Sequence, residues 1–350
     1  MNKFLESLIV CISCCLIFLA TPVIAQDSVY VFKEGGNGTT TIKGRITKMT
    51  PDGVTIDGKD FPVSKIARIS VGKEPGAVNR LRGEMLDGKY ADCLAGIAKL
   101  RNVPDAPLLQ QEIEFMKAYS TARLSLTQGT IPADKAGSAV KGFLSKYPNS
   151  MHTYSATEQF GRLAYSTGNL EAAAREFEKL RGAKWEKYQM RGQFLHGRMM
   201  SVLGKTSLAK ADFDGILNQS SNSKESDQYK LLARCEQARI EGLTGSTAAA
   251  LEKLNKLIKD ESDENTDLFA HIYNAMGAIH DKTGNLKEAR DAYLHTQLLF
   301  NSVEDEDPAA EALYRLSKIY VELKDSKRAG EAKRELQAKY RNSYWFKKGS

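Results

Sequence analysis

The feature that most constrains this chain is a phrase that returns at a nearly constant spacing. The segment GNLEAAAREFEKL begins at Gly168, and a related segment, GNLKEARDAYLHT, begins at Gly284. Each has an apolar residue two positions after the glycine, a small residue at five and an aromatic residue at nine. Versions of this pattern start at seven anchors separated by 36 to 41 residues: Gly88, Gly129, Gly168, Gly204, Gly245, Gly284 and Lys324. Regularity of this kind is typical of proteins built from one repeated supersecondary unit.

The spacing inside each phrase predicts a helix, because positions two, five, nine and twelve share one helix face. A small residue also stands seven positions before most anchors, as at Gly161 and Gly277, where a second helix can approach closely. Two helices joined by a short turn cannot bury both faces alone, whereas stacked pairs can. We therefore predict a mainly α chain, with a solenoid of about seven helical hairpins over residues 76–342, inside a region 75–350 that ends in a C-terminal cap. In such a solenoid each unit touches only its neighbours.

This region resembles the tetratricopeptide repeat (TPR) family. The matching residues of two units are Gly161, Gly168, Ala173 and Phe177, and Gly277, Gly284, Ala289 and Tyr293. The phrases LSKYPNS (144–150) and LQAKYRNS (336–343) resemble repeat ends of extracytoplasmic TPR proteins, such as the Tol-Pal-associated periplasmic coordinator and outer-membrane assembly lipoproteins. The repeats are longer than the usual length of about 34 residues, and the family's early tryptophan is missing. The resemblance implies a right-handed TPR-like α-solenoid that binds a protein or peptide and has no catalytic activity.

Residues 1–25 differ from the rest of the chain. The run SLIVCISCCLIFLATPVIA is apolar, is short for a membrane span and ends in a small-residue cleavage pattern. It predicts a secretory signal peptide cleaved near Ala25, with an uncleaved N-terminal anchor as the alternative. A cleaved chain would be periplasmic or secreted and would keep two of the five cysteines, Cys93 and Cys235. Because these lie in the first and fifth repeats, we expect two free thiols.

Residues 26–74 are rich in valine, isoleucine, threonine and glycine. Alternating segments such as TIKGRITKM, and the turn signal Pro51-Asp52-Gly53, predict four or five short strands. We expect a small all-β, barrel-like module before the solenoid. It is weakly similar to SH3-like and Sm-like barrels, in the rhythm of its strands alone.

Sequence patterns for catalysis or metal binding are missing. The five histidines form neither an HExxH motif nor an i, i+4 pair, and no GxSxG elbow or kinase-type set occurs. Acidic runs at 260–267 and 304–308 lack the spacing of a calcium loop, and we expect them to be solvated connections between repeats. Asp307-Pro308 is typical of a helix start. The sequence therefore predicts no enzyme, no cofactor and no metal site.

One column of the predicted inner helices is strongly basic. The residues six positions before the anchors are Arg82, Arg123, Arg162, Arg198, Arg239, Ala278 and Lys318. The basic side chains either pair with glutamates of neighbouring helices or line a concave groove as a ladder for carboxylates, which arginine binds through two parallel hydrogen bonds. Phe194 and Tyr314 occupy another predicted groove position, as candidate apolar anchors.

These features favour an exported, non-enzymatic scaffold that binds an acidic peptide or protein segment in the solenoid groove, with envelope association as a further expectation. The alternative is an RNA-binding protein in which an Sm-like barrel adjoins a basic solenoid, since the net charge is +7. Signal cleavage and the lack of an aromatic-rich platform on the module argue against RNA. We therefore expect neither a nucleic acid nor a small-molecule substrate.

Overall fold

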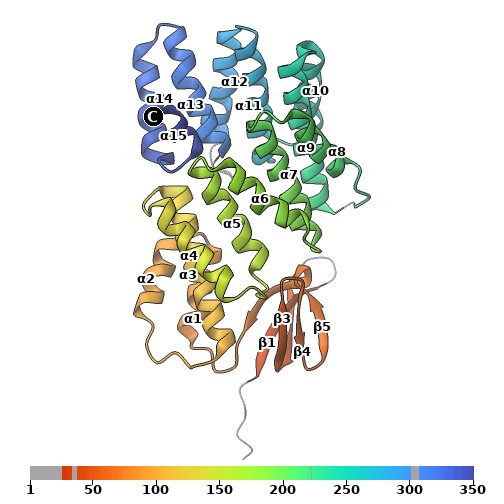
Figure 1. The fold of residues 1–350 in the computed structure, drawn as a ribbon, viewed down its shortest axis with the longest axis vertical. Helices are drawn as coiled ribbons and strands as arrows, with labels where there is room; N and C mark the ends of the chain where they lie inside the picture. Colours follow the sequence, from red (N-terminus) through yellow and green to blue (C-terminus); the bar gives the residue numbers. More distant parts are fainter. Residues whose placement is uncertain (1–25, 34–37, 222, 301–306) are drawn as a thin grey trace, which may run out of the picture.

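The computed structural model describes residues 26–33, 38–221, 223–300 and 307–350 (Figure 1). The predicted signal peptide lies outside these residues, as does most of the acidic run at 304–308. The chain passes from a small β module through a long array of helices to a short C-terminal helix. Within the described ranges, none of the helices combines the length and the apolar character needed to cross a membrane.

The described helices form seven consecutive hairpins and one terminal helix. The pairs are α1 (Gly76–Leu86) with α2 (Tyr90–Lys99), α3 (Pro107–Gln128) with α4 (Ala133–Lys146), α5 (Thr153–Ser166) with α6 (Leu170–Arg181), α7 (Glu186–Val202) with α8 (Thr206–Leu217), α9 (Lys224–Thr244) with α10 (Thr247–Asp260), α11 (Thr266–Lys282) with α12 (Leu286–Leu299), and α13 (Asp307–Glu322) with α14 (Ser326–Tyr340), followed by α15 (Tyr344–Gly349). This arrangement confirms the mainly α solenoid that the repeat spacing predicted.

The turns and contacts of each hairpin explain the residue types at the repeat positions. Gly168 and Gly284 follow their inner helices with φ of 81° and 76°, a conformation in which a Cβ is disfavoured. Lys324 adopts the same left-handed conformation, with φ of 61°, in the one pair whose anchor is not glycine. Gly277 packs on the ring of Tyr293, where an added Cβ would lie 2.8 Å from ring atoms. The small and the aromatic repeat positions are thus two halves of one contact.

The β module contains two three-stranded antiparallel sheets. One has the order β2-β1-β6, made of β2 (Thr39–Gly44), β1 (Asp27–Phe32) and β6 (Ile66–Ser70). The other has the order β3-β4-β5, made of β3 (Ile46–Thr50), β4 (Gly53–Ile56) and β5 (Lys59–Pro62). Val29, Ile56 and Ile69, which come from both sheets, share one buried core.

The structure has one strand more than the upper limit that the sequence predicted. The additional boundary is the two-residue turn Asp57-Gly58, which separates β4 from β5. Both residues have positive φ, 46° and 76°, as the tight turns of two-residue hairpins require. The aspartate–glycine pair is the sequence signal for this turn, and the prediction overlooked it.

The C-terminus corrects the expectation that each repeat touches only its neighbours. Helix α14 contacts α3, and α15 contacts α5, so the seventh repeat meets the second and third (Figure 1). The Asn342 side-chain amide donates to the carbonyls of Ser125 at 3.0 Å and Ile131 at 2.9 Å. The ring of Tyr344 stacks on that of Tyr165 with centroids 5.0 Å apart. We call residues 342–345 the clasp, because they fasten the end of the solenoid to its second and third hairpins.

The two cysteines of the described chain are free and fully buried, as expected from their separate repeats. Burial raises the pKa of the Cys235 thiol well above its ordinary value, and it also raises the pKa of Cys93. Neither thiol is therefore reactive in the folded chain. We expect a thiol reagent to label neither residue of the native chain beginning at Gln26, and to label both after denaturation without reductant. Fewer labels on denatured monomer would indicate a disulfide and contradict the fold.

Candidate interaction groove

A large groove lies between the β module and the inner helices of the first half of the solenoid. Its cavity volume is about 970 Å³. We call it the main groove; its lining includes Ile66, Ala67, Arg68, Ile69, Leu86, Tyr90, Glu112, Phe115, Tyr119, Arg123, His152, Glu158, Gln159, Trp185, Lys187, Tyr188 and Arg191. A second hollow of about 360 Å³ continues along α7, α9 and α11 and shares Lys187, Arg191 and Glu225 with the first.

Polar contacts hold the β module in place on one side of this groove. The Tyr154 hydroxyl donates to Asp52 Oδ1 at 2.6 Å, and Lys184 Nζ lies 3.2 Å from Asp52 Oδ2. The bond from Tyr154 and the charge of Lys184 hold the pKa of Asp52 below its ordinary value. Burial, together with the bond to Asp52, raises the pKa of Tyr154 to about 12. These bonds tie the β3–β4 turn to α5 and fix where β6 stands relative to the inner helices.

Aromatic rings form much of the groove wall. Phe115 stacks on the imidazole of His152 at 3.8 Å and contacts Tyr119 at 5.6 Å between ring centroids. Two apolar side chains that border the cavity are open to solvent: Leu86 is 66% exposed and Phe32 is 49% exposed. The groove thus offers apolar contact area to a ligand without any rearrangement.

A buried carboxylate cluster stabilises the groove beneath this wall. Arg82 donates to both carboxylate oxygens of Glu74 at 2.9 Å, and its Nε lies 3.5 Å from Glu112. Glu112 also lies 2.6 Å from His152 Nε2. Burial disfavours the Glu112 anion, but His152 and Arg82 outweigh it and hold the pKa of Glu112 below its ordinary value. Arg82 is therefore an internal ion-pair partner in the folded chain.

A second cluster of the same kind centres on Glu158. Arg162 donates to Glu158 Oε1 at 2.7 Å, and Arg191 contacts the same oxygen at 2.9 Å. Burial opposes ionisation of Glu158, whereas the two guanidinium groups, Arg191 first, lower its pKa overall. Two arginines from α5 and α7 are joined through one carboxylate, which links neighbouring repeats at the groove floor.

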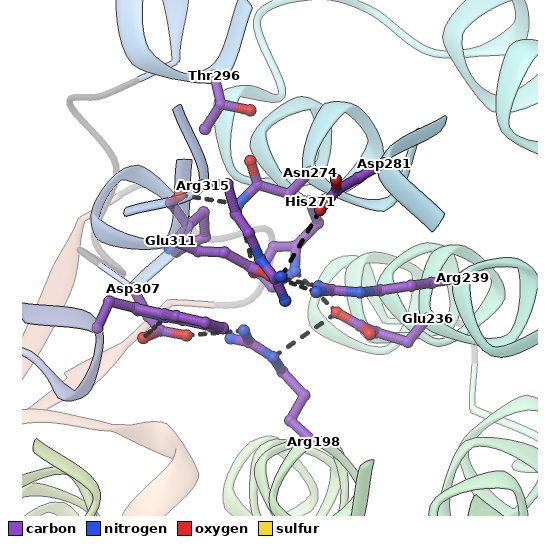
Figure 2. A network of polar contacts seen from close by, with 12 residues as sticks. Arg198, Glu236, Arg239, His271, Asn274, Asp281, Thr296, Asp307, Glu311 and Arg315 are labelled. Atoms are coloured by element: carbon purple, nitrogen blue, oxygen red, sulfur yellow. Dashed lines mark hydrogen bonds and ion pairs between the residues drawn. The ribbon is translucent and has the colours of Figure 1, made fainter. Parts of the chain in front are cut away.

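Arg198 and Arg239 each pair with a carboxylate of the last inner helix, α13. Figure 2 shows both arginines pointing toward it. Arg198 donates to Asp307 at 2.7 Å, and Arg239 donates to both oxygens of Glu311, one of them at 3.1 Å. Glu236 lies 3.6 Å from Arg198. The acidic group that the arginine column was expected to bind is thus supplied, for these two members, by the chain's own seventh repeat.

The remaining residues of the predicted site lie in different environments. Arg123 borders the main groove and donates from Nε to the Tyr90 hydroxyl at 3.4 Å. Lys318 and Tyr314 form a cation–π contact of 5.6 Å in a small hollow at the C-terminal cap, away from the main groove. Phe194 borders the second hollow but is only 3% exposed, and its ring contacts Phe213 and His271. The structure therefore does not bring the eight predicted residues together as one row.

Sequence reasoning missed Asp307 and Glu311. It correctly placed Asp307 at a helix start, where α13 begins, but it expected the acidic run to be solvated. Asp307 instead accepts hydrogen bonds from Arg198 and from the Trp345 indole at 2.9 Å. The signal that could have shown them is their spacing of i, i+4 as an acidic pair on one inner helix, while most of the other inner helices carry arginine. It also missed Gln159, whose Oε1 is buried beside the main groove without a hydrogen-bond partner. Such an acceptor is satisfied when a ligand brings an N–H group.

Across the described ranges, no cluster of three or more histidine, cysteine, aspartate or glutamate side chains is arranged to hold a metal ion. The titratable groups at the groove floor are instead tied in the ion pairs described above.

The stacked hairpins, with a groove along their inner helices, define a TPR-like α-solenoid. Among solved structures, a tetratricopeptide repeat protein from Parabacteroides merdae is similar, with a TM-score of 0.51 and 17% identity, over 76% of this chain and 94% of that one. NprR in complex with its cognate peptide NprX has a TM-score of 0.47 and 12% identity, over 75% of this chain and 76% of that chain. A Rap protein complexed with Competence and Sporulation Factor has a TM-score of 0.47 and 15% identity, over 77% and 76%. The sequence matches no protein-family model and none of the curated proteins compared with it.

Proposed function

We propose that this chain is an exported, non-enzymatic scaffold that binds an acidic segment of a protein partner in the main groove. The observation that carries the proposal is the groove itself, a cavity of about 970 Å³ that is lined by aromatic rings and basic side chains. Arg123 of α3 and Lys187 of α7 border the cavity and suit carboxylates. Exposed Leu86 and Phe32 suit an apolar side chain of the same segment.

A binding role fits the groove better than catalysis. A catalytic acid and base pair needs surroundings that shift the two pKa values apart, so that one group is protonated and the other ionised near neutral pH. Glu112 and Glu158 are instead held as anions, because His152 and Arg82 lower the pKa of Glu112, and Arg191 and Arg162 lower that of Glu158. RNA binding is also less favoured, since Arg82, Arg198 and Arg239 already carry carboxylate partners and contribute less to a field for phosphates.

The binding proposal is tested with a phage-displayed library of random peptides about ten residues long, long enough to cross the groove. We expect enriched peptides to combine aspartate or glutamate with an apolar residue, and to bind less tightly as salt rises. The variant Leu86→Glu with Lys187→Glu places negative charge at the groove and should weaken binding at least tenfold. The matched control, Leu208→Glu with Lys210→Glu, makes the same changes on exposed positions of α8.

Equal binding by the groove variant and the control would refute the groove as the site. Tighter binding of a mixed-sequence RNA oligonucleotide than of any enriched peptide would instead favour the RNA alternative.

The export proposal has its own test. N-terminal sequencing of the chain purified from its source cells should begin at or next to Gln26, as the cleavage pattern after Ala25 requires. A chain that still begins at its first methionine would support the retained anchor. Recovery of the chain in the cytoplasmic fraction would refute export.

A further inference from the structure

Strand β6 has a strand neighbour on one side only. It pairs antiparallel with β1 through Val29 with Ile69 and Tyr30 with Arg68, and the sheet order is β2-β1-β6. In the described part of the chain, no strand pairs with its other side. An edge strand of this kind presents a row of main-chain N–H and C=O groups that a further strand can bind.

The open edge of β6 borders the main groove. Four consecutive residues, 66 to 69, line the cavity. The register with β1 shifts at Ala67, so side chains of this strand do not alternate regularly. Ile66 and Ile69 are both buried in the core of the β module, whereas Ala67 and Arg68 between them are half-buried. A cavity on one face of the strand would not meet both kinds of residue. Contact with four residues in succession places the cavity along the strand's edge, where its free hydrogen-bonding groups lie.

The charged residue of this strand leaves the edge accessible. Proteins often protect edge strands with a charged side chain. The Arg68 guanidinium lies 3.9 Å from the centroid of the Tyr30 ring, on the paired strand β1, and donates to Asn79 of α1. Although Arg68 borders the groove, its guanidinium is thereby engaged with β1 and α1.

The groove also offers places for the side chains and the main chain of an added strand. Phe115, Tyr119 and Tyr188 border the same cavity. The Gln159 amide oxygen, buried and without a hydrogen-bond partner, is an acceptor for a peptide N–H. An extended polypeptide is the ligand that supplies both main-chain N–H donors and side chains that alternate between two faces.

We propose that the partner segment binds as an additional β-strand along the open edge of β6, with alternate side chains against the aromatic wall of the main groove. This inference rests on the proposed function, because it specifies how a polypeptide occupies that groove. The five residues of β6 set the length of the paired region, which spans about 17 Å. Main-chain pairing supplies affinity for many sequences, while the groove selects side chains at every second position.

The test measures amide hydrogen exchange of the purified chain with and without a peptide enriched from the library. We expect exchange of β6 amides to slow at least tenfold when the peptide is saturating, because the free edge becomes hydrogen-bonded. Strand β5 is the matched control, since it is also an edge strand but none of its residues lines the main groove. Its amides should exchange at the same rate in both samples.

Peptide N-methylation provides the second measurement. Methylating amides at alternate positions should weaken binding roughly tenfold for the set that faces β6, and much less for the other set. Peptides that need the groove but show neither β6 protection nor this alternation would overturn strand addition and leave the proposed function intact. Peptides indifferent to the Leu86 and Lys187 substitutions, or no enriched peptide at all, would overturn both proposals.

Discussion

Replacing Glu311 with glutamine will lower the free energy of unfolding by about 3–5 kcal/mol. Glu311 is fully buried and accepts two hydrogen bonds from Arg239, while Arg315 Nε lies 4.0 Å away. Burial raises the pKa of Glu311, but the Arg239 charge outweighs it and keeps the carboxylate ionised. The neutral amide leaves Arg239 buried without its counter-charge, which is the most costly way to break an ion pair. Urea unfolding followed by circular dichroism measures the loss.

The control is an exposed pair in the same repeat. Lys339 Nζ lies 2.7 Å from Glu335 on α14, with the lysine largely exposed, so Lys339→Gln should change stability by less than about 1 kcal/mol. Adding Arg239→Gln to Glu311→Gln should cost far less than the sum of the two single losses, because one interaction is removed only once. Additive losses would show that Arg239 and Glu311 do not depend on each other.

The second large effect is a loss of stability in acid that results from protonation of Glu236. His271 Nδ1 lies 3.2 Å from this buried carboxylate, and Arg198 lies 3.6 Å away. Burial opposes the anion, but the His271 bond and the charges of Arg239 and Arg198 lower its pKa from 4.5 to about 2. A depressed pKa in the folded state stabilises the protein above the unfolded pKa, and the contribution disappears as pH falls toward the folded value.

We therefore expect protonation of Glu236 to lower the free energy of unfolding by about 3 kcal/mol as the pH falls from roughly 4.5 to 2. Neighbouring cationic groups also hold three other pKa values down, namely those of Glu112 (His152 and Arg82), Glu158 (Arg191) and Glu311 (Arg239), so the total loss in acid is larger. Glu236→Gln removes the titrating group, and its unfolding free energy should be lower at neutral pH but change less in acid. Parallel pH profiles for variant and wild type would rule out this role for Glu236.

The repeat positions carried the prediction of the solenoid because each depends on contacts within one hairpin or between adjacent ones. Gly277 predicts a close approach, and its partner Tyr293 lies in the next helix. The contact of Asn342 with Ser125 spans 217 residues. It depends on the rotation accumulated over all intervening repeats, which no local pattern encodes.

The arginine column shows the same limit at the level of single side chains. The sequence showed which positions of the inner helices carry arginine, but the partner of Arg198 lies 109 residues away in α13. The main groove was not predictable from the β module or from the helical repeats alone, since β6 lines it from the one and α3 from the other. Strand alternation identifies the core face of a strand, whereas a free edge is known only once its neighbours are placed.

The clasp fixes how many repeats this protein can have. Open solenoids lengthen or shorten by whole repeats, because an extra unit at any point adds one more interface of the same kind. Here Asn342 meets Ser125 only if the units between them complete the required turn. One helix pair more or fewer would displace the clasp by at least the 8–10 Å or so that separates packed helices, far outside hydrogen-bonding distance. Adding or removing a unit between α3 and α14 would therefore break the clasp, so the number of units in this part of the chain is fixed by the contact at its end.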